Sequence, residues 1–339
     1  MIFHNAMRFF ARQYKILTGI AFLFFLMYPF IFSTPLLLRL GTLCMVFVML
    51  ALALNIVTGF MGQTSFGTAA FWGIGCYTAA ILSTRFEVGS GITFIAAMLI
   101  SGLFSLLLSI PVMKLEGYYL SIVTLGFCEI IRLVELNWVD LTRGPMGIPN
   151  IPKLSFFGME VTNSTIMYFI MLALLILTTY FVSMLSNSHF GRVLTAIRDD
   201  GLATRSIGIN ITGYKIAAFF IYAMISGLAG AFYAHYVSYI DPSMFTFNQS
   251  VEITVMVILG GLGNIVGSFI GAIVLTVLPE LIRGLMEYRM LIYGGLMVAL
   301  MLLKPTGILG NVNFRYIRQR LSIEQQQPSA RHNKRGAKK

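Results

Sequence analysis

The chain has 339 residues, of which 57% are hydrophobic and only 11% are charged, and its mean hydropathy is +0.82. Soluble domains carry about 25% charged residues, so this composition excludes an ordinary globular enzyme and indicates a polytopic membrane protein. The net charge of +11 does not indicate a nucleic-acid partner, because the basic residues lie between and beyond long apolar runs, as cytoplasmic lysines and arginines do in membrane proteins.

Apolar runs long enough to cross a bilayer recur along the chain, since a spanning helix needs about 20 mostly apolar residues. The sequence predicts an all-α fold of about ten transmembrane helices. Their approximate ranges are 16–33, 37–58, 64–84, 92–113, 117–136, 164–186, 213–239, 250–265, 266–283 and 288–304. The three cysteines, Cys44, Cys76 and Cys128, fall inside apolar runs, with no spacing typical of disulfides or metal sites.

The first apolar run follows Arg8, Arg12 and Lys15, which is how a signal peptide begins. No small-x-small cleavage site ends this run; two prolines, Pro29 and Pro35, follow it instead. We therefore predict an uncleaved first span with a cytoplasmic N-terminus.

A first glycine-rich stretch, TGFMGQTSFGTAAFWGIGCYTAA, covers residues 58–80. The residues of interest are Gly59, Gly62, Gln63, Ser65 and Gly67. Small residues allow helix backbones to approach closely. A helix break inside a membrane is tolerated only where protein or a water-filled cavity satisfies the backbone. The stretch therefore predicts either tight helix packing or a broken helix that lines a translocation path.

The fifth predicted span carries Glu129 and Arg132, which are three residues apart and can pair on one helix face. A pair of this kind near the membrane interface is more typical of a structural contact than of a proton relay. The loop that follows, 137–163, is rich in proline and glycine. We expect an irregular extracytoplasmic connection there, which is either a plain linker or a surface that faces a partner or the solute entrance.

The most polar internal segment is the loop 187–212, which contains Arg192, Arg198, Asp199, Asp200 and Arg205. The apolar residues Val193, Leu194 and Ile197 recur at helical spacing and predict an amphipathic helix.

Asp200 is expected to cap a second helical turn that begins at Gly201, and Gly208 to end that turn. An interfacial helix bound to lipid would also be amphipathic. The adjacent acids Asp199 and Asp200 favour docking of a cytoplasmic protein instead, because anionic headgroups would repel them.

A second glycine-rich stretch, LGGLGNIVGSFIGA, covers residues 259–272 and includes Gly260, Gly261 and Gly263. It has the same two interpretations as the first. The surrounding region, 250–283, is too long for one span, and we predict two spans that turn near Gly263 and Asn264.

The C-terminal tail, 311–339, is basic and polar, and we expect it to be disordered and able to touch anionic lipid. Ten spans place both termini and the loop 187–212 in the cytoplasm, together with most of the 24 lysines and arginines. Eight or nine spans with a re-entrant segment at a glycine-rich stretch remain an alternative.

Sequence motifs of nucleotide hydrolysis, metal binding and nucleophilic catalysis are absent: no GxxxxGK[ST], HExxH, CxxC or GxSxG occurs, and the four histidines are scattered. We expect no enzyme activity, no cofactor and no metal. Uphill transport would then draw its energy from an ion gradient or from a separate ATPase.

The loop resembles the coupling region of M-type permease subunits in branched-chain amino-acid ABC transporters, whose signature reads GR-x₃-AIRDD-x₂-A-x₄-G-I/V-N. The matching residues are Gly191, Arg192, Ala196, Ile197, Arg198, Asp199, Asp200, Ala203, Gly208, Ile209 and Asn210. The similarity extends over about 55–310 and includes both glycine-rich stretches. The chain departs from the family at Thr68, where histidine is frequent, and at Thr204, where alanine is usual and where we expect a mild change of the docking surface.

This resemblance implies an inner-membrane importer in which residues 1–310 form the permease domain. Its partners would be an H-type permease subunit, two cytoplasmic ABC ATPases, an extracytoplasmic substrate-binding protein and membrane lipid. The implied cargo is leucine, isoleucine or valine. Related permeases for urea and short amides leave a second cargo class open, and a self-sufficient secondary carrier or a membrane enzyme are further alternatives.

Overall fold

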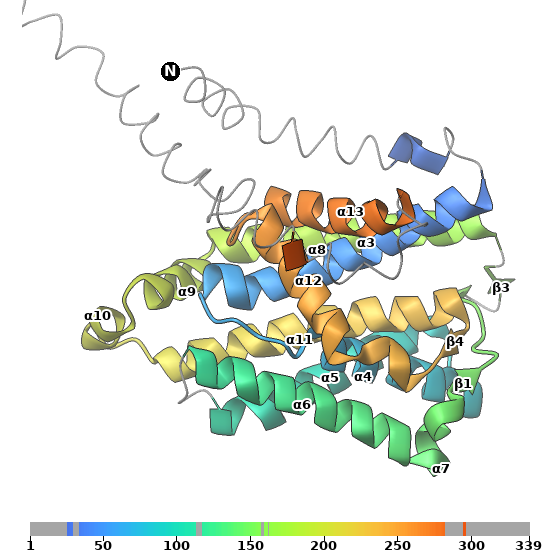
Figure 1. Cartoon of the computed structure of the whole chain (residues 1–339), viewed down its shortest axis with the longest axis horizontal. Coiled ribbons are helices and arrows are strands. Elements are labelled where there is room, and N and C mark those ends of the chain that lie inside the picture. Colours follow the sequence, from blue (N-terminus) through green and yellow to red (C-terminus); the bar gives the residue numbers. More distant parts are fainter. Residues whose placement is uncertain are drawn as a thin grey trace, which may run out of the picture.

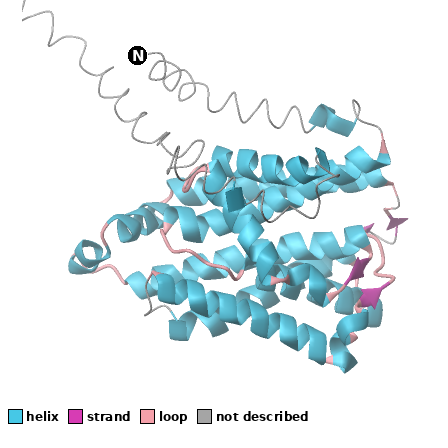
Figure 2. Cartoon of the chain, in the orientation of Figure 1, coloured by secondary structure: helices cyan, strands magenta, loops and turns pink. Residues whose placement is uncertain are grey.

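The computed structural model describes residues 26–29, 34–112, 117–156, 159–161, 163–281 and 294–295. Most of these residues are helical (Figure 2). Four helical stretches are long and apolar enough to cross a membrane: Pro35–Phe60, Ser90–Val112, Ser164–Asn187 and Ile211–Val237. A polytopic, helical membrane fold is thus confirmed. The predicted spans 16–33 and 288–304 fall almost entirely outside the described residues, and the tail 311–339 falls wholly outside them.

The long helices are labelled in Figure 1, as are most of the short elements between them. In chain order the elements are α3 Pro35–Asn55, η1 Ile56–Phe60, α4 Thr68–Arg85, α5 Ser90–Val112, α6 Tyr118–Asn137, α7 Val139–Thr142, η2 Gly144–Met146, β1 Ile148–Pro149, β2 Ser155–Phe156, β3 Met159–Glu160, α8 Ser164–Asn187, α9 His189–Asp199, α10 Gly201–Ser206, α11 Ile211–Val237, β4 Tyr239–Ile240, η3 Pro242–Phe245, α12 Phe247–Gly260 and α13 Ile265–Leu281. The strands form two short antiparallel pairs, β1 with β4 and β2 with β3.

Helix α3 lies at the centre of the described bundle, where it packs against α8, α11, α12 and α13. Its second half and η1 are fully enclosed, and every residue over 48–57 is buried. A helix that is apolar on all sides is expected to be buried on all sides, and α3 is surrounded by other helices rather than by lipid. The five residues of η1 form a π-helix, a rare geometry that is frequent at functional sites.

Glycines set the close crossing of α4 and α11. An ideal Cβ on Gly75 would lie 2.3 Å from the carbonyl oxygen of Gly227, and one on Gly230 would lie 2.4 Å from the carbonyl oxygen of Trp72. The thiol of Cys76 donates to the carbonyl oxygen of Gly230 at 3.2 Å. Without a side chain at these positions the two backbones are in direct contact, which is the usual way membrane helices associate.

The described part of region 250–283, residues 250–281, is divided between two helices that turn near Gly263 and Asn264, as predicted. Helix α12 ends at Gly260, the chain turns over 261–264, and α13 begins at Ile265. The two helices pack through Gly260, since an ideal Cβ there would lie 2.0 Å from the carbonyl oxygen of Gly267. With 14 residues, α12 is about 21 Å long, which is shorter than the hydrocarbon core of a bilayer.

The predicted irregular loop 137–163 and the polar loop 187–212 lie at opposite ends of the bundle (Figure 1). The first is tied to the bundle by β1–β4 pairing and by the buried His235, whose Nδ1 lies 2.7 Å from the carbonyl oxygen of Pro152 and whose Nε2 lies 3.0 Å from Thr93 Oγ1. The described part of loop 137–163 is therefore tied to the bundle at Ile148, Pro149 and Pro152.

Candidate functional site

The polar loop folds into two short helices, α9 and α10, and its predicted caps are confirmed. The carboxylate of Asp200 accepts a hydrogen bond from the backbone N–H of Ala203 at 3.0 Å and so caps the N-terminus of α10. Gly208, just after α10, has φ +83°, a conformation that favours glycine over other residues.

The apolar stripe of α9 faces the chain's own bundle. Val193, Leu194 and Ile197 are buried, and α9 packs against α8, α11 and η1. A lipid-binding interfacial helix needs its apolar stripe for the acyl chains, and here that stripe is already occupied by protein. The apolar side chains that α10 and its end leave outward are Leu202 and Ile207, which are 80% and 73% exposed.

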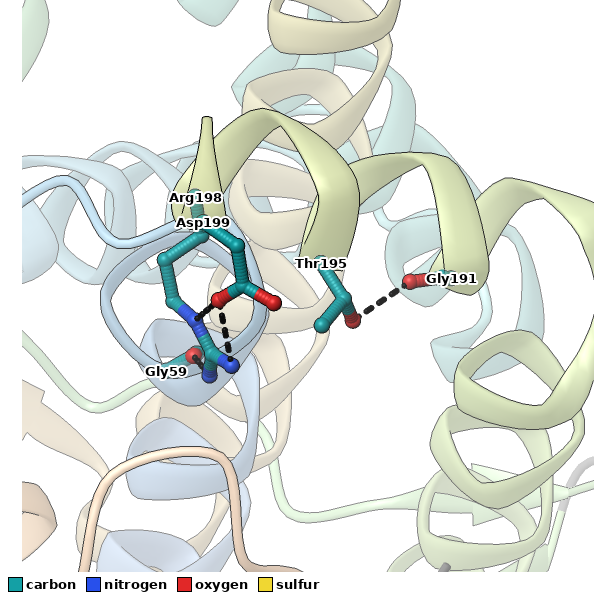
Figure 3. Close-up of polar contacts among 5 residues, drawn as sticks. All are labelled: Gly59, Gly191, Thr195, Arg198 and Asp199. Atoms are coloured by element: carbon teal, nitrogen blue, oxygen red, sulfur yellow. Dashed lines mark hydrogen bonds and ion pairs between the residues drawn. The ribbon is translucent and has the colours of Figure 1, made fainter. Parts of the chain in front are cut away.

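The α8–α9 corner depends on Gly191. An ideal Cβ on this residue would lie 2.5 Å from the carbonyl oxygens of both Leu185 and Ser186, so a side chain would push the two helices apart. Thr195 Oγ1 donates to the Gly191 carbonyl oxygen at 2.9 Å (Figure 3). The corner therefore holds α9 at a fixed angle to α8.

The remaining predicted residues of this region differ in exposure. Arg192 is exposed and its Nη1 donates to the carbonyl oxygen of Asn187 at 3.1 Å. Asp199 and Ala203 are exposed, whereas Ala196 is half-buried. The exposed face of α9 and α10 is thus mixed in charge and ends in two apolar side chains.

Arg198 connects this loop to the first glycine-rich stretch (Figure 3). Its Nη1 donates to the carbonyl oxygen of Gly59 at 3.0 Å, while Nε and Nη2 both donate to Asp199 Oδ1 at 3.1 and 3.0 Å. The side chain also runs over Gly62, where an ideal Cβ would lie 2.3 Å from Arg198 Cγ. The guanidinium therefore bridges the surface loop and the end of the central helix.

The second glycine-rich stretch meets the first through Asn55, a fully buried residue of α3. Asn55 Nδ2 donates to the carbonyl oxygen of Asn264 at 3.1 Å and to Ser268 Oγ at 3.0 Å, and Oδ1 accepts from the N–H of Gly263 at 2.9 Å. An ideal Cβ on Gly59 would lie 1.8 Å from Asn55 Oδ1 and 2.3 Å from the Gly263 nitrogen. We call Asn55, Gly59, Gly62 and Gly263 the glycine junction.

Between η1 and α4 the chain leaves the helix over residues 61–67, here called the break segment. Helix α4 begins at Thr68, four residues after the approximate start of the predicted span 64–84. Hydroxyl groups of α6 satisfy the irregular backbone: Thr124 Oγ1 accepts from the N–H of Phe66, and Ser121 Oγ donates to the carbonyl oxygen of Thr64, both at 3.0 Å. Non-helical backbone inside a membrane requires such partners.

The other polar residues of the break segment point inward. Ser65 Oγ accepts from the N–H of Gly67 at 3.3 Å, just before α4. Gln63 is buried, and its Oε1 has no hydrogen-bond partner among the described residues. Gly261, with φ +116°, starts the turn after α12. Gly59 and Gly260 therefore serve close packing, Gly261 and Gly263 lie with positive φ in the turn after α12, and residues 61–67 form a true break.

The two departures from the family pattern have different surroundings. The hydroxyl groups of Thr68 and Tyr222 lie 2.6 Å apart in the buried core. The expectation that Thr204 alters the docking surface is wrong, because Thr204 is buried and its Oγ1 donates to the carbonyl oxygen of Asp200 at 2.7 Å.

Three residues of the site were not singled out from the sequence. Asn55 carried a usable signal, since an amide inside the apolar run LALALNIV must find partners when it is buried. Leu202 and Ile207 carried none, because apolar residues in a short helix are usually buried. Within the described ranges, no three His, Cys, Asp or Glu side chains converge as metal ligands would.

Replacing Asn55 by alanine should destabilise the chain by about 3 kcal/mol, because the N–H of Gly263 and the carbonyl of Asn264 lose a buried partner together. Thermal unfolding of the purified protein in detergent measures this change. Asn187→Ala is the control, since Asn187 is exposed at the end of α8 and should change the unfolding temperature little. Equal effects of the two substitutions would show that the junction does not hold the fold together.

A family profile and several individual relatives show which known proteins this chain is similar to. The sequence profile of the family described as "Branched-chain amino acid transport system / permease component" matches residues 36–301. The chain is 36% identical over 292 residues to the high-affinity branched-chain amino acid transport system permease protein LivM of Salmonella typhimurium, covering 79% of this chain and 69% of that protein.

The LivM protein of Escherichia coli K12 has the same identity and coverage. The LivH permease of Escherichia coli K12 is 24% identical over 295 residues, which is 79% of this chain and 92% of LivH. No solved structure matches the chain significantly. Its helices, its two glycine-rich stretches and its capped polar loop are thus those of a membrane protein that belongs to the family of permease components of branched-chain amino acid transport systems.

Proposed function

We propose that this chain is an inner-membrane permease subunit of an ABC importer that carries branched-chain amino acids into the cell. Ten spans with both termini in the cytoplasm would place α9 and α10 on the cytoplasmic side and loop 137–163 outside. The observation that carries the proposal is the hydrogen bond from Arg198, on the exposed loop, to Gly59, at the end of the buried central helix.

The proposed partners are an H-type permease subunit, two cytoplasmic ATPases and an extracytoplasmic binding protein. Similarity to relatives named LivM and LivH supports a transport system with two kinds of permease chain. The exposed Leu202 and Ile207, beside Arg192, Asp199 and the other charged groups of the loop, have the mixed apolar and polar character of a protein interface. Figure 1 shows α10 projecting beyond the end of the bundle, where a cytoplasmic ATPase can reach it.

The glycine junction suggests how a motion of the ATPases would reach the spans. A shift of α9 moves Arg198, and Arg198 holds the carbonyl of Gly59 and covers Gly62. Asn55 ties the same point to the turn between α12 and α13 through Gly263. One displacement at the surface would therefore act on the break segment and on the α12–α13 turn together.

Leu202→Asp should weaken binding of the ATPase subunit by about 30-fold, because a central apolar contact at a protein interface is worth about 2 kcal/mol. Co-purification and binding of the isolated ATPase to the detergent-solubilised chain measure this. Ser206→Asp adds the same charge to the exposed surface of α10 without removing an apolar contact, and should have a smaller effect. If Leu202→Asp leaves ATPase binding unchanged but displaces α10 from lipid vesicles, the result would favour an interfacial helix that binds lipid.

Arg198→Glu should leave the complex assembled but lower the amount of solute imported per ATP hydrolysed by at least about tenfold, since coupling free energies are typically 1–3 kcal/mol. A carboxylate at this position cannot donate to the Gly59 carbonyl and lies beside Asp199. Gly208→Pro should act in the same direction, because proline cannot adopt φ +83°. Arg198→Lys keeps the charge and is the conservative control. Normal uptake by both disruptive variants would remove the coupling role.

The complete transporter in proteoliposomes should import radiolabelled leucine when ATP and the binding protein are present. Excess isoleucine or valine should compete with leucine, whereas excess urea should not. Competition by urea and short amides alone would assign the chain to the second cargo class. Uptake by this chain alone, without any ATPase, would establish a secondary carrier instead.

A further inference from the structure

The outward residues of the described helices differ between two sides of the bundle. On α5 the outward residues are large and apolar, as expected of a helix that faces lipid: Ile92, Ile95, Leu99, Leu103, Leu107 and Ile110 are all exposed. The side built from the break segment, α6 and the start of α12 lies on the near side of the view in Figure 1. It also exposes apolar residues of α6, such as Ile122, Ile130 and Leu133, but it carries a half-exposed ion pair on the same helix as well. These segments are in contact through the two α6 hydrogen bonds to the break segment and through the rings of Phe66 and Phe247, whose centroids are 5.6 Å apart.

Helix α6 itself has a polar and an apolar flank. Ser121, Leu125, Glu129 and Arg132 recur at intervals of three or four residues and so share one side of the helix. This side of α6 faces the break segment, because Ser121 Oγ donates to the carbonyl oxygen of Thr64. The opposite flank carries apolar residues only: Val123, Phe127, Ile130 and Val134.

The polar flank holds an ion pair well inside the helix. Arg132 Nε donates to Glu129 Oε2 at 2.8 Å, and the two side chains remain 28% and 35% exposed. Glu129 lies eight residues before the end of α6, a distance of about 12 Å along the axis. The pair therefore lies more than one helical turn inside α6 rather than at its last residues.

Charged side chains and irregular backbone cannot face hydrocarbon, because both need polar surroundings. Gly62 of the break segment and Asn248 of α12 are also exposed on the chain by itself. A water-filled path bounded by a second permease subunit supplies what all these groups need. A dry contact with that subunit would leave the charges desolvated.

We propose that the α6 flank with Ser121, Leu125, Glu129 and Arg132 lines the solute path, and that the Glu129–Arg132 pair gives a zwitterionic amino acid its polar contacts. An α-ammonium group is complementary to the Glu129 carboxylate, and an α-carboxylate is complementary to the Arg132 guanidinium. When an amino acid passes, the bond between Glu129 and Arg132 is replaced by two bonds, one from each side chain to the amino acid. A neutral amide has neither charge and gains no such exchange.

This inference rests on the proposed function, and a cysteine test separates the two. In the complete transporter, Leu125→Cys should react with the membrane-impermeant reagent [2-(trimethylammonium)ethyl] methanethiosulfonate, because a thiol in water ionises. Ile130→Cys, on the apolar flank of the same helix, and Leu103→Cys on α5 should react at least about tenfold more slowly. The native Cys44, Cys76 and Cys128 are buried, and the unmodified chain supplies the background.

Leucine with its binding protein should slow the labelling of Leu125→Cys. Equal, background-level labelling at all three positions in a transporter that still imports leucine would overturn the inference and leave the proposed function standing. Crosslinking of Leu125→Cys to the second permease without reagent labelling would show a dry interface and would also overturn it.

The double variant Glu129→Gln/Arg132→Gln tests the ligand chemistry. Removing both charges together leaves no unpaired ion, so the fold should be retained. Leucine uptake should fall at least about tenfold while ATP hydrolysis with the binding protein continues, since a hydrogen bond to a charged group is worth at least this factor. Uptake at the original rate would show that the pair is only structural.

Discussion

The side-chain amide of Asn55 is the contact on which the rest of the described structure depends. Inside a membrane no water is available for a backbone group that has left its helix, so such a group must find a partner in the protein. Asn55 is the last residue of α3 before η1, and it provides one acceptor contact and two donor contacts to Gly263 and Asn264 of the α12–α13 turn and to Ser268 of α13. Without it, the N–H of Gly263 would lose its hydrogen bond to Asn55, and the Asn264 carbonyl and the Ser268 hydroxyl would each lose one of their contacts.

Glycine makes this arrangement geometrically possible. Gly59 and Gly263 bring two backbones closer than any side chain would permit, and Gly62 leaves room for the stem of Arg198. The same device sets the α4–α11 crossing at Gly75 and Gly230. Tight packing and helix breaking are therefore not competing uses of the glycine-rich stretches, because the close packing at Gly59 supports the break that follows it.

The charged groups of α9, α10 and α6 lie at specific positions in the fold. Those on α9 and α10 lie at one end of the bundle, and Arg198 turns inward from them to the glycine junction. The Glu129–Arg132 pair lies on the α6 flank beside the break segment. A chain with so few charged residues is suited to moving a solute past its spans without holding it tightly.

The sequence by itself determined the membrane class, most helix positions, the cap and the end of α10 and the turn between α12 and α13, because these follow from local hydropathy, spacing and capping chemistry. It also identified both glycine-rich stretches and the polar loop as separate features. Only the tertiary structure decided that they meet: Arg198 is 139 residues from Gly59 and Asn55 is 208 from Gly263. Side-chain packing over such separations leaves no periodic trace in one sequence. For the same reason the burial of Thr204 and the exposure of Leu202 and Ile207 could not be predicted from local pattern.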